Sequence, residues 1–445
     1  MSKVLLIGYN PPQLVRNTKI EAAHYRTWQF LEPLLADNHA VCLCAGVRGE
    51  IESATEIPPS WQPNLQYHPI RFGEQGWVQQ LQQLHDQFDP DCVVAVNFSH
   101  CLYATKLQTT RPIWMDIYGD MLTIMQAAAY RARSDRGLTT SMAFMRLVLQ
   151  KGDVFSGCGL PQQHMMVGEL AMAGRLNHRT FAYPFVRTVP PGSPPGNMVA
   201  IPRQTPRQIL AEHGIHEDNF VVLWCGGYNT WTDVDTLFKA LTWAMAENGS
   251  LHYVSVGANT YQAPDNVYDR LLALIDKSPF RHRFHMLGWR PWSEVPHFYR
   301  ESDVGINIDA LHYETIYGTR TRLVEMIADG LPVVTSLGAE LSYLLRDRGA
   351  ALTFEVGDWQ GMGEQLIKLA QEPGLRNQMA ATAHEFATTA LSFAATTKAM
   401  REWVRQPQIA PDKVPLDTRD RIKSVEHRLR SLLRRTMWRL RATDQ

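Results

Sequence analysis

The chain has 445 residues, of which 45% are hydrophobic and 20% charged, a composition that suits two or three globular domains. Its 44 basic residues balance 44 acidic ones, so the composition does not indicate a nucleic-acid binder. No apolar run is long enough for a transmembrane helix, and the early prolines in MSKVLLIGYNPP argue against a signal peptide. Six scattered cysteines without a CxxC pair indicate reduced thiols in a cytosolic protein.

The first half of the sequence alternates short apolar runs with amphipathic stretches. Strands are expected at residues 3–10, 40–46, 90–99, 111–120 and 152–159, and helices at about 19–35 and 77–88. This alternation predicts a parallel, doubly wound α/β sheet. Sheets of this kind bind ligands beyond the carboxyl ends of their strands.

A proline-rich stretch separates this half from a second α/β pattern. Residues 187–206 contain six prolines and two glycines and are expected to form a linker. Further strands are expected at 220–229, 251–259, 283–289, 303–309 and 332–336, with helices between them. We therefore predict two Rossmann-like domains facing a cleft, a return helix to the first domain, and a separate tail, at residues 1–186, 207–390, 391–406 and 407–445.

Two glycines follow the first strand of the second domain, in the sequence FVVLWCGGYNTWTD. Gly226 and Gly227 permit a tight turn before a helix for which Thr232 and Asp235 could form a capping box. The amides of such a turn can bind phosphate, and a plain strand-to-helix turn is the alternative. The DVD sequence at 233–235 resembles a metal-binding DxD motif, but its position in the first helical turn favours interaction with the helix dipole.

A second candidate site lies in the sequence GTRTRLVEMIADGLPVV, where Thr319 or Thr321 is expected to cap a helix. Arg320 and Arg322 stand at the positive end of this helix dipole, where each cation is unfavourable by about 0.3–1 kcal/mol. A bound diphosphate would reverse that balance through charge-assisted hydrogen bonds. The alternative is a surface ion pair between Arg322 and Glu325, three residues further along the helix.

The turn GGYN, the GW before SEVPHFY, the strand SDVGINI and the helix GTRTRLVEMIADGLPVV occur in this order. Together they resemble the nucleotide-sugar-binding half of GT-B glycosyltransferases, close to the family-4 retaining group, from about residue 220 to 336. The resemblance implies that Glu325 holds the donor ribose. It also implies that the diphosphate, sugar and nucleobase of the donor lie near Gly226, Gly227, Tyr228, Asn229, Trp289 and Arg290.

The sequence departs from the family pattern in its basic residues and in one spacing. The family often carries an Arg after the glycine turn and a Lys some residues later, and GGYNTWTD supplies neither. The usual E-x7-E spacing is absent, because Tyr317 stands eight residues before Glu325. We therefore expect Arg320 and Arg322, beside Thr319, to contact the diphosphate. Arg320→Ala is expected to abolish donor binding and to leave the fold intact.

The first domain is then expected to hold the acceptor at its strand ends. Tyr9 and Asn10 end the first strand, and His24 and Tyr25 lie on the helix that follows. Such positions face the cleft in a doubly wound fold, so these four residues are candidates for the acceptor side. For His24 and Tyr25 the alternative is an ordinary surface or core role.

Two carboxylates, Asp116 and Asp120, flank another strand end in the sequence WMDIYGD. The resemblance implies a front-face reaction without a protein nucleophile. We therefore expect these residues to orient the substrate or relay a proton rather than form a covalent intermediate. For Asp120 the alternative is a cap on the following helix.

The last 29 residues differ from the rest of the chain. Residues 417–445 carry nine Lys or Arg and four Asp or Glu, a net charge of +5, which leaves residues 1–416 near −5. Ile422, Val425, Leu429 and Leu440 fall at helical spacing, which predicts a basic amphipathic helix. Such a helix suits docking on anionic lipid, a coiled coil with a partner protein, or packing on the acidic body of the chain.

These features predict a cytoplasmic, retaining glycosyltransferase that moves a sugar from a nucleotide-diphosphate donor to a glycan, lipid-linked or small-molecule acceptor. No metal or cofactor is expected, since helix amides and basic side chains can stabilise the departing diphosphate. Peripheral attachment to the inner face of a membrane and a role in polysaccharide biosynthesis are further expectations. Two alternatives stay open: a GT-B nucleotide-sugar epimerase, and a non-catalytic glycosyltransferase-like module that binds a partner.

Overall fold

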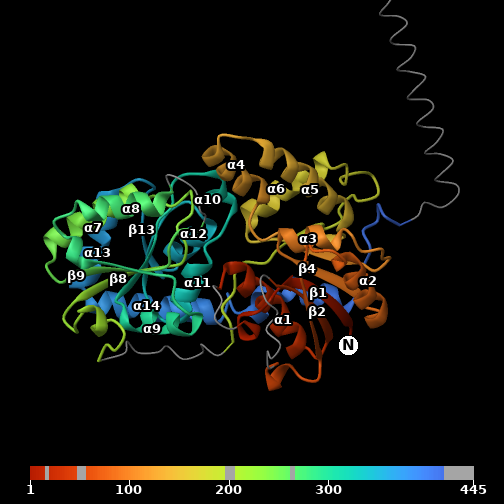
Figure 1. The fold of residues 1–445 in the computed structure, drawn as a ribbon, viewed down its shortest axis with the longest axis horizontal. Coiled ribbons are helices and arrows are strands. Elements are labelled where there is room, and N and C mark those ends of the chain that lie inside the picture. Colours follow the sequence, from red (N-terminus) through yellow and green to blue (C-terminus); the bar gives the residue numbers. More distant parts are fainter. Residues whose placement is uncertain (16–19, 48–56, 196–205, 261–265, 415–445) are drawn as a thin grey trace, which may run out of the picture.

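The computed structural model describes residues 1–15, 20–47, 57–195, 206–260 and 266–414. These residues form two α/β domains side by side, each built on one parallel sheet (Figure 1). The prediction of two doubly wound, Rossmann-like domains is confirmed. All six cysteines are buried and none forms a disulfide.

The first domain is built on a seven-stranded parallel sheet in the order β3-β2-β1-β4-β5-β6-β7. Its strands are β1 (Lys3–Tyr9), β2 (Ala40–Gly46), β3 (Leu65–Ile70), β4 (Cys92–Val96), β5 (Ile113–Asp116), β6 (Val154–Gly157) and β7 (Val186–Thr188). The strand order reverses between β1 and β4, so the loops that follow these two strands diverge and open a crevice.

Helices cover both faces of this sheet, as the alternation of buried side chains along β1 requires. The helices are α1 (Ala22–Ala36), α2 (Trp77–Phe88), α3 (Phe98–Ala104), α4 (Met121–Ala132), α5 (Arg136–Lys151) and α6 (Leu160–Met172). Val4 and Leu6 pack with α1, whereas Leu5 and Ile7 pack with α2, α3, α5 and α6.

The second domain has a six-stranded parallel sheet in the order β10-β9-β8-β11-β12-β13, which reverses between β8 and β11. Its strands are β8 (Phe220–Cys225), β9 (Leu251–Val256), β10 (Phe284–Gly288), β11 (Val304–Asn307), β12 (Val333–Ser336) and β13 (Ala351–Phe354). Along β8, Val221 and Leu223 enter one core layer, and Val222 and Trp224 enter the other. This second switch point faces the first across the domain boundary.

The helices of the second domain flank this sheet on both faces. They are α7 (Val234–Glu247), α8 (Val267–Asp276), α9 (Val295–Glu301), α10 (Tyr313–Tyr317), α11 (Thr321–Ala328), α12 (Glu340–Asp347), α13 (Trp359–Gln371) and α14 (Pro373–Thr388). Single 3₁₀ turns lie at Pro12–Leu14, Pro59–Trp61, Ala211–His213, Arg281–Arg283 and Trp292–Glu294. Helix α11 starts in the loop system at the carboxyl edge of the sheet, which places its N-terminus at the domain boundary.

The chain then returns to the first domain, as expected, but through two short helices. These are α15 (Phe393–Thr396) and α16 (Lys398–Arg405). The Ser2 hydroxyl donates to the Val404 carbonyl oxygen at 2.9 Å, and Arg401 pairs with Asp37 at 2.5 Å. These contacts fasten the return segment to the face of the first sheet that α1 also covers.

The expected domain limits differ from the structure at two points. Strand β7 includes residues expected in the linker, because Val186–Thr188 pairs with β6. Residues 407–414 still contact the first domain, where Asp412 pairs with Arg175 at 2.5 Å. The expected basic helix at 417–445 lies outside the described residues.

Several elements were missed in the sequence. Strand β3 contains Pro69, which is tolerated because the strand lies at the sheet edge. Helices α4 and α5 lie in a stretch whose apolar residues point outward as well as inward, so their helical period is obscured.

Candidate functional site

The carboxyl edges of the two sheets face each other across a cleft of about 530 Å³. Polar and aromatic residues of the first domain line it at Tyr9, Glu21, Tyr25, Asn97, Ser99 and Tyr118. The opposite wall contains Gly226, Gly227, Asn229, Thr260, Trp289, Arg290, Thr319, Arg320, Arg322 and Glu325. Most residues expected to bind the donor therefore lie on one wall.

The glycine turn after β8 brings backbone to the cleft floor. Gly226 has φ of +105°, a left-handed conformation that disfavours other residues. A β-carbon on Gly227 would lie 2.4 Å from the Thr260 hydroxyl oxygen, so this position also requires glycine. Tyr228 differs from expectation, because its hydroxyl bonds to Tyr253 and Ser255 in the core and the side chain is 1% exposed. Asn229 lines the cleft as predicted.

The helix after the turn is capped differently from the prediction. Asp233, rather than Thr232, caps α7 by accepting from the Thr236 amide at 3.1 Å. Thr232 accepts instead from the Asn229 amide at 3.1 Å, which stabilises the turn itself. Asp235 pairs with Arg270 at 2.8 Å, so the DVD carboxylates have structural partners.

Arg322 is a half-buried cation whose described contacts include no carboxylate. Its guanidinium lies 3.9 Å from the Trp224 ring centroid, and Nη2 donates to the Gly227 carbonyl oxygen at 2.9 Å. Nη1 is buried and has no partner among the described residues. Burial lowers the pKa of this arginine, and neighbouring Arg320 lowers it further. An anion at this point would relieve both effects, as the sequence led us to expect of Arg322.

Arg320 lies beside it and is placed differently from the prediction. Its Nε donates to Asp309 at 2.8 Å, and its two terminal nitrogens donate to Glu314 at 3.1 and 2.9 Å. The remaining N–H groups contact the Thr319 carbonyl and the Thr315 hydroxyl. The carboxylates raise its pKa despite the opposing effect of burial. Since its donors are committed, Arg320 is a structural cation, and its removal is not compatible with an undisturbed fold.

Glu325 faces the cleft one helical turn beyond Arg322. Its Oε2 accepts from the Tyr299 hydroxyl at 3.0 Å, and burial raises its pKa to about 7. The surface ion pair considered for Arg322 and Glu325 does not match this buried position. The start of α11 also differs from expectation, because neither Thr319 nor Thr321 caps it and the N-cap residue is Arg320.

A second cation lies at the end of β10. Trp289 is 38% exposed and lines the cleft with Arg290. The buried Nε of Arg290 has no hydrogen-bond partner in the described part of the chain. Arg290 and Arg322 therefore both line the cleft, and each has a buried N–H group without a described partner.

The acceptor-side candidates separate into wall residues and support residues. Tyr9 lines the cleft with its ring 4.4 Å from that of His100. Asn10 accepts from the Tyr67 hydroxyl at 2.9 Å, and its carbonyl contacts His24 Nδ1 at 2.7 Å. Asn10 and His24 thus brace the loop after β1, and neither lines the cleft.

Two tyrosines of the first domain reach across the cleft. The Tyr25 oxygen accepts from Trp292 Nε1 at 2.5 Å, and Tyr118 shares a hydrogen bond with the Thr321 hydroxyl at the start of α11. Burial raises the pKa of Tyr25, and Glu325 contributes to the rise. The two walls are therefore in direct contact beside Glu325.

Both carboxylates expected to act in catalysis are recessed from the cleft. Asp116 is fully buried and accepts from Arg26 at 2.7 and 2.8 Å and from the Ser156 hydroxyl at 2.6 Å. Asp120 is 1% exposed and caps α4 by accepting from the Thr123 amide. Neither residue lines the cleft, because Asp116 neutralises a buried arginine and Asp120 serves the helix terminus.

Sequence reasoning missed several wall residues, among them Asn97, Tyr118 and Thr260. Asn97 and Tyr118 lie within two residues of the ends of β4 and β5. They could have been predicted by treating the residues after every strand as candidates for the cleft. Thr260 gives no such local signal. Its hydroxyl donates to the Tyr228 carbonyl at 3.1 Å and becomes relevant only once the turn is built.

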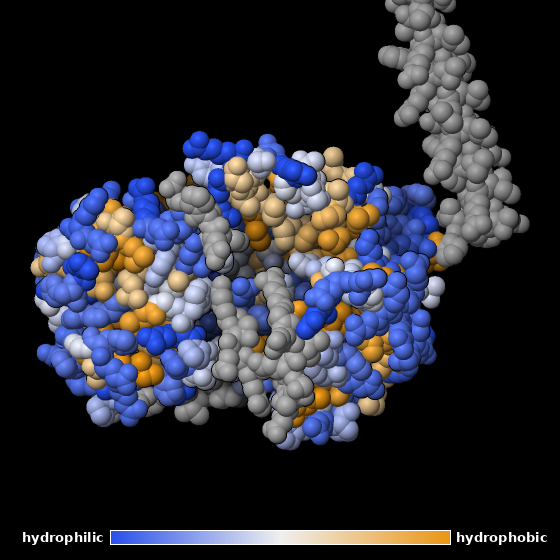
Figure 2. Space-filling model, in the orientation of Figure 1, coloured by the Kyte–Doolittle hydropathy of each residue, from blue (hydrophilic) through white to orange (hydrophobic). Residues whose placement is uncertain are grey.

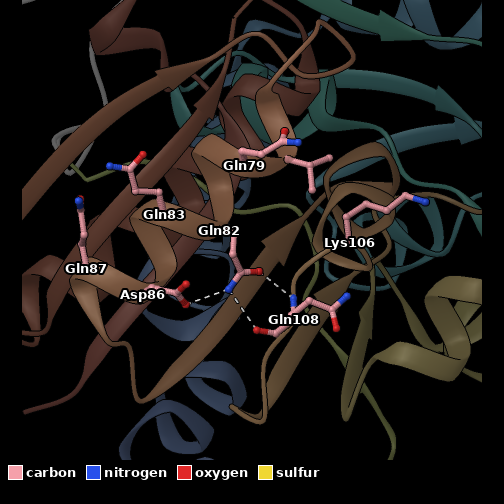
Figure 3. A pocket seen from close by; sticks show the side chains of 8 residues that line it. Gln79, Gln82, Gln83, Asp86, Gln87, Lys106 and Gln108 are labelled. Atoms are coloured by element: carbon pink, nitrogen blue, oxygen red, sulfur yellow. Dashed lines mark hydrogen bonds between the residues drawn. The ribbon is translucent and has the colours of Figure 1, made fainter.

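Another concave region, on the outside of the first domain, has a different character (Figure 3). Glutamines of α2 line it with Asp86, Lys106 and Gln108. The Gln82 side chain donates to Asp86 and to the Gln108 carbonyl, and it accepts from the Gln108 amide, so these groups satisfy one another. This is a shallow polar surface remote from the cleft.

Comparisons with known proteins agree with this geometry. Residues 219–372 match the family model described as glycosyl transferases group 1. The fold is similar to that of HepE from Anabaena in complex with UDP and glucose, with a TM-score of 0.64 and 14% identity over 91% of this chain and 100% of that one. The chain therefore has the GT-B fold, and its second domain matches a glycosyltransferase family.

Two other solved structures have the same fold as this chain. Sucrose-phosphate synthase from Thermosynechococcus elongatus has a TM-score of 0.66 and 15% identity over 91% of this chain and 99% of that one. WaaG, a glycosyltransferase involved in lipopolysaccharide biosynthesis, has a TM-score of 0.60 and 17% identity over 91% of this chain and 100% of that one. No curated protein matches the chain.

The described residues contain neither a metal-binding cluster nor a membrane-spanning helix. No group of three or more His, Cys, Asp or Glu side chains there is placed to hold a metal ion. Among the helices in the described ranges, none is both long and apolar enough to cross a membrane.

Proposed function

We propose that this chain is a glycosyltransferase that transfers a sugar from a uridine-diphosphate donor, and that the donor binds on the second-domain wall of the cleft. The main support for this proposal is Arg322 beside the glycine turn, because its Nη1 group is buried and has no partner among the described residues. The structures of HepE with UDP and with UDP-glucose favour uridine among the nucleotides.

The diphosphate would lie between the glycine turn and the start of α11. Arg322 would donate to one phosphate, and the amide groups of the turn would supply neutral donors. Arg290 would supply a second positive charge from the end of β10. These cations and amides stabilise charge on the departing diphosphate, so we propose that transfer needs no metal.

Glu325 would accept from the ribose hydroxyls, the role that the family resemblance gives it. Its carboxylate already holds one hydrogen bond from Tyr299, which fixes its orientation before the donor arrives. Trp289, partly exposed at the same edge, offers a flat apolar surface to the base. We further propose retention of configuration, on the resemblance alone.

The acceptor would lie against the first domain, where the wall is aromatic and mostly uncharged. Tyr9, Asn97, Ser99 and Tyr118 offer hydroxyl and amide groups suited to a sugar or another polyol. A glycan or lipid-linked acceptor, a role in polysaccharide synthesis and attachment to a membrane surface belong to this proposal.

A thermal-shift screen of the full chain with UDP, GDP, dTDP, ADP and their sugars, with and without Mg²⁺, tests the donor assignment. UDP is expected to raise the melting temperature most, and equally without Mg²⁺, because a ligand stabilises the state it binds. Arg322→Gln should remove the shift. A larger shift with another nucleotide, or none with any, contradicts the proposal.

A further inference from the structure

Exposed apolar side chains are concentrated on one part of the first domain. Nine of the sixteen large hydrophobic residues exposed in the described chain lie between residues 130 and 181. Figure 2 shows this apolar surface over α4, α5 and α6. We call it the α4–α6 face; its apolar members are Tyr130, Met142, Phe144, Leu147, Val167, Met172, Leu176 and Phe181.

Helix α5 shows that this exposure is a second apolar surface rather than an incomplete core. Met145 and Val148 point inward and are buried. Phe144 and Leu147, at a spacing of three residues, lie together at one flank of this buried stripe and are 38% and 45% exposed. Met172, at the end of α6, is 90% exposed. A clustered apolar surface of this kind marks a site of association.

The charges around the face are mostly positive. Residues 121–182 contain seven Lys or Arg and three Asp or Glu. Arg133, Arg136 and Arg146 on and between α4 and α5 are exposed, against a single exposed carboxylate, Asp135, in these two helices and their connection. Apolar side chains bordered by arginines match the boundary between lipid headgroups and acyl chains.

The described chain also ends beside this face. Arg179 donates to the Asp412 carbonyl at 3.1 Å and to the Val414 carbonyl at 2.5 Å, which holds the segment near the loop containing Phe181. Phe181 is 90% exposed. The remaining sequence, at residues 417–445, has a net charge of +5. The described chain therefore ends beside this face, and the sequence that follows is basic.

We propose that the α4–α6 face docks on an anionic lipid bilayer, with its apolar side chains in the interface and its arginines on lipid phosphates. Residues 417–445 carry the same sign of charge as the arginines beside the face, which disfavours stable packing of that segment on the face. An anionic lipid surface would attract both the segment and the arginines. The docking does not depend on the donor assignment. It places the acceptor domain against the membrane.

Sedimentation with vesicles tests the docking on the full chain. Binding is compared between phosphatidylcholine vesicles and vesicles that contain phosphatidylglycerol, at low and high salt. The full chain should bind only the second kind, and salt should weaken binding. Phe144→Ser with Leu147→Ser should reduce the partition coefficient about tenfold, since two apolar groups no longer enter the interface. The matched control Leu311→Ser removes a 71% exposed leucine from the second domain and should change nothing.

A charge series distinguishes the face from the rest of the chain. Substituting Arg133, Arg136 and Arg146 with Gln should reduce vesicle binding about tenfold or more, because each cation near an anionic membrane surface contributes to the attraction. Neutralising the exposed Arg270, Arg281 and Lys398 should have little effect.

Neutralising Arg434, Arg435 and Arg439 to Gln tests the basic segment separately. If only this variant loses binding, the face is not a docking surface and the proposal is overturned. The proposal is also overturned if the full chain does not bind vesicles that contain phosphatidylglycerol better than phosphatidylcholine vesicles. A concentration-dependent dimer in solution, abolished by the Phe144 and Leu147 changes, would assign the face to a second copy instead.

Discussion

The two walls of the cleft differ in how their polar groups are satisfied. On the second-domain wall, buried N–H groups of Arg290 and Arg322 have no described partner, and Glu325 has one hydrogen bond and a raised pKa. In the first domain, Asp116 and Asp120 lie behind the cleft wall and are fully engaged. Unsatisfied buried groups are costly, so they persist where a ligand completes them. The difference indicates a charged ligand on one wall and a neutral one on the other.

The same contrast appears at smaller scale in two arginines of α11 and its N-cap. Arg320 is surrounded by Asp309 and Glu314, whereas Arg322 rests on Trp224 and a backbone carbonyl. One arginine holds the wall together and the other is available to the ligand. Substituting each of them is the strongest way to test this comparison.

Arg320→Gln should cause the largest effect. It leaves the Asp309 and Glu314 carboxylates buried without their cation, which costs about 3–5 kcal/mol of unfolding free energy. Urea denaturation followed by tryptophan fluorescence measures it. A stability equal to that of the unmodified chain would mean that Arg320 is free for the donor after all.

Arg322→Gln should spare stability and weaken donor binding. It removes charge-assisted hydrogen bonds worth about 1.5–3 kcal/mol, or roughly 10- to 100-fold in the dissociation constant. Isothermal titration with UDP measures the change, and Arg322→Lys, which keeps the charge, should recover part of it. The assignment fails if Arg322→Gln unfolds the chain while Arg320→Gln leaves it intact.

The sequence anticipated the domain architecture and the second-domain wall better than the first. Strand and helix periods recur regularly from Phe220 to Ser336, and four residues singled out there, Gly226, Gly227, Arg322 and Glu325, line the cleft. The different roles of Arg320, which is structural, and Arg322, which is available to a ligand, were not predictable. They depend on Asp309, which contacts Arg320 only in the folded loops. Nor was the burial of Asp116, whose partner Arg26 lies 90 positions away.

A pH series sharpens the comparison at Glu325. Its pKa in the free chain is raised to about 7 by burial, so the carboxyl is largely protonated below that pH. If the ionised form accepts from the ribose, affinity for UDP-glucose should rise up to about tenfold from pH 6 to pH 8, because one pKa unit corresponds to a tenfold change. UDP-glucose is used because it lacks a phosphate group that titrates in this range. Glu325→Gln should give weaker binding without this pH dependence.

The smallest expected effect concerns the contact between the walls. Tyr25→Phe removes the hydroxyl that accepts from Trp292 across the cleft, a hydrogen bond worth about 0.5–1.5 kcal/mol. Because the pKa of Tyr25 is raised further above its usual range, its hydroxyl stays neutral from pH 6 to pH 8, and its loss should leave the midpoint of the UDP-glucose pH series unmoved. Affinity at pH 8 should fall only about two- to tenfold, since the ring still packs against Trp28 and Trp292. A changed affinity with an unmoved midpoint assigns Tyr25 to the contact between the domains, whereas a moved midpoint would contradict this assignment.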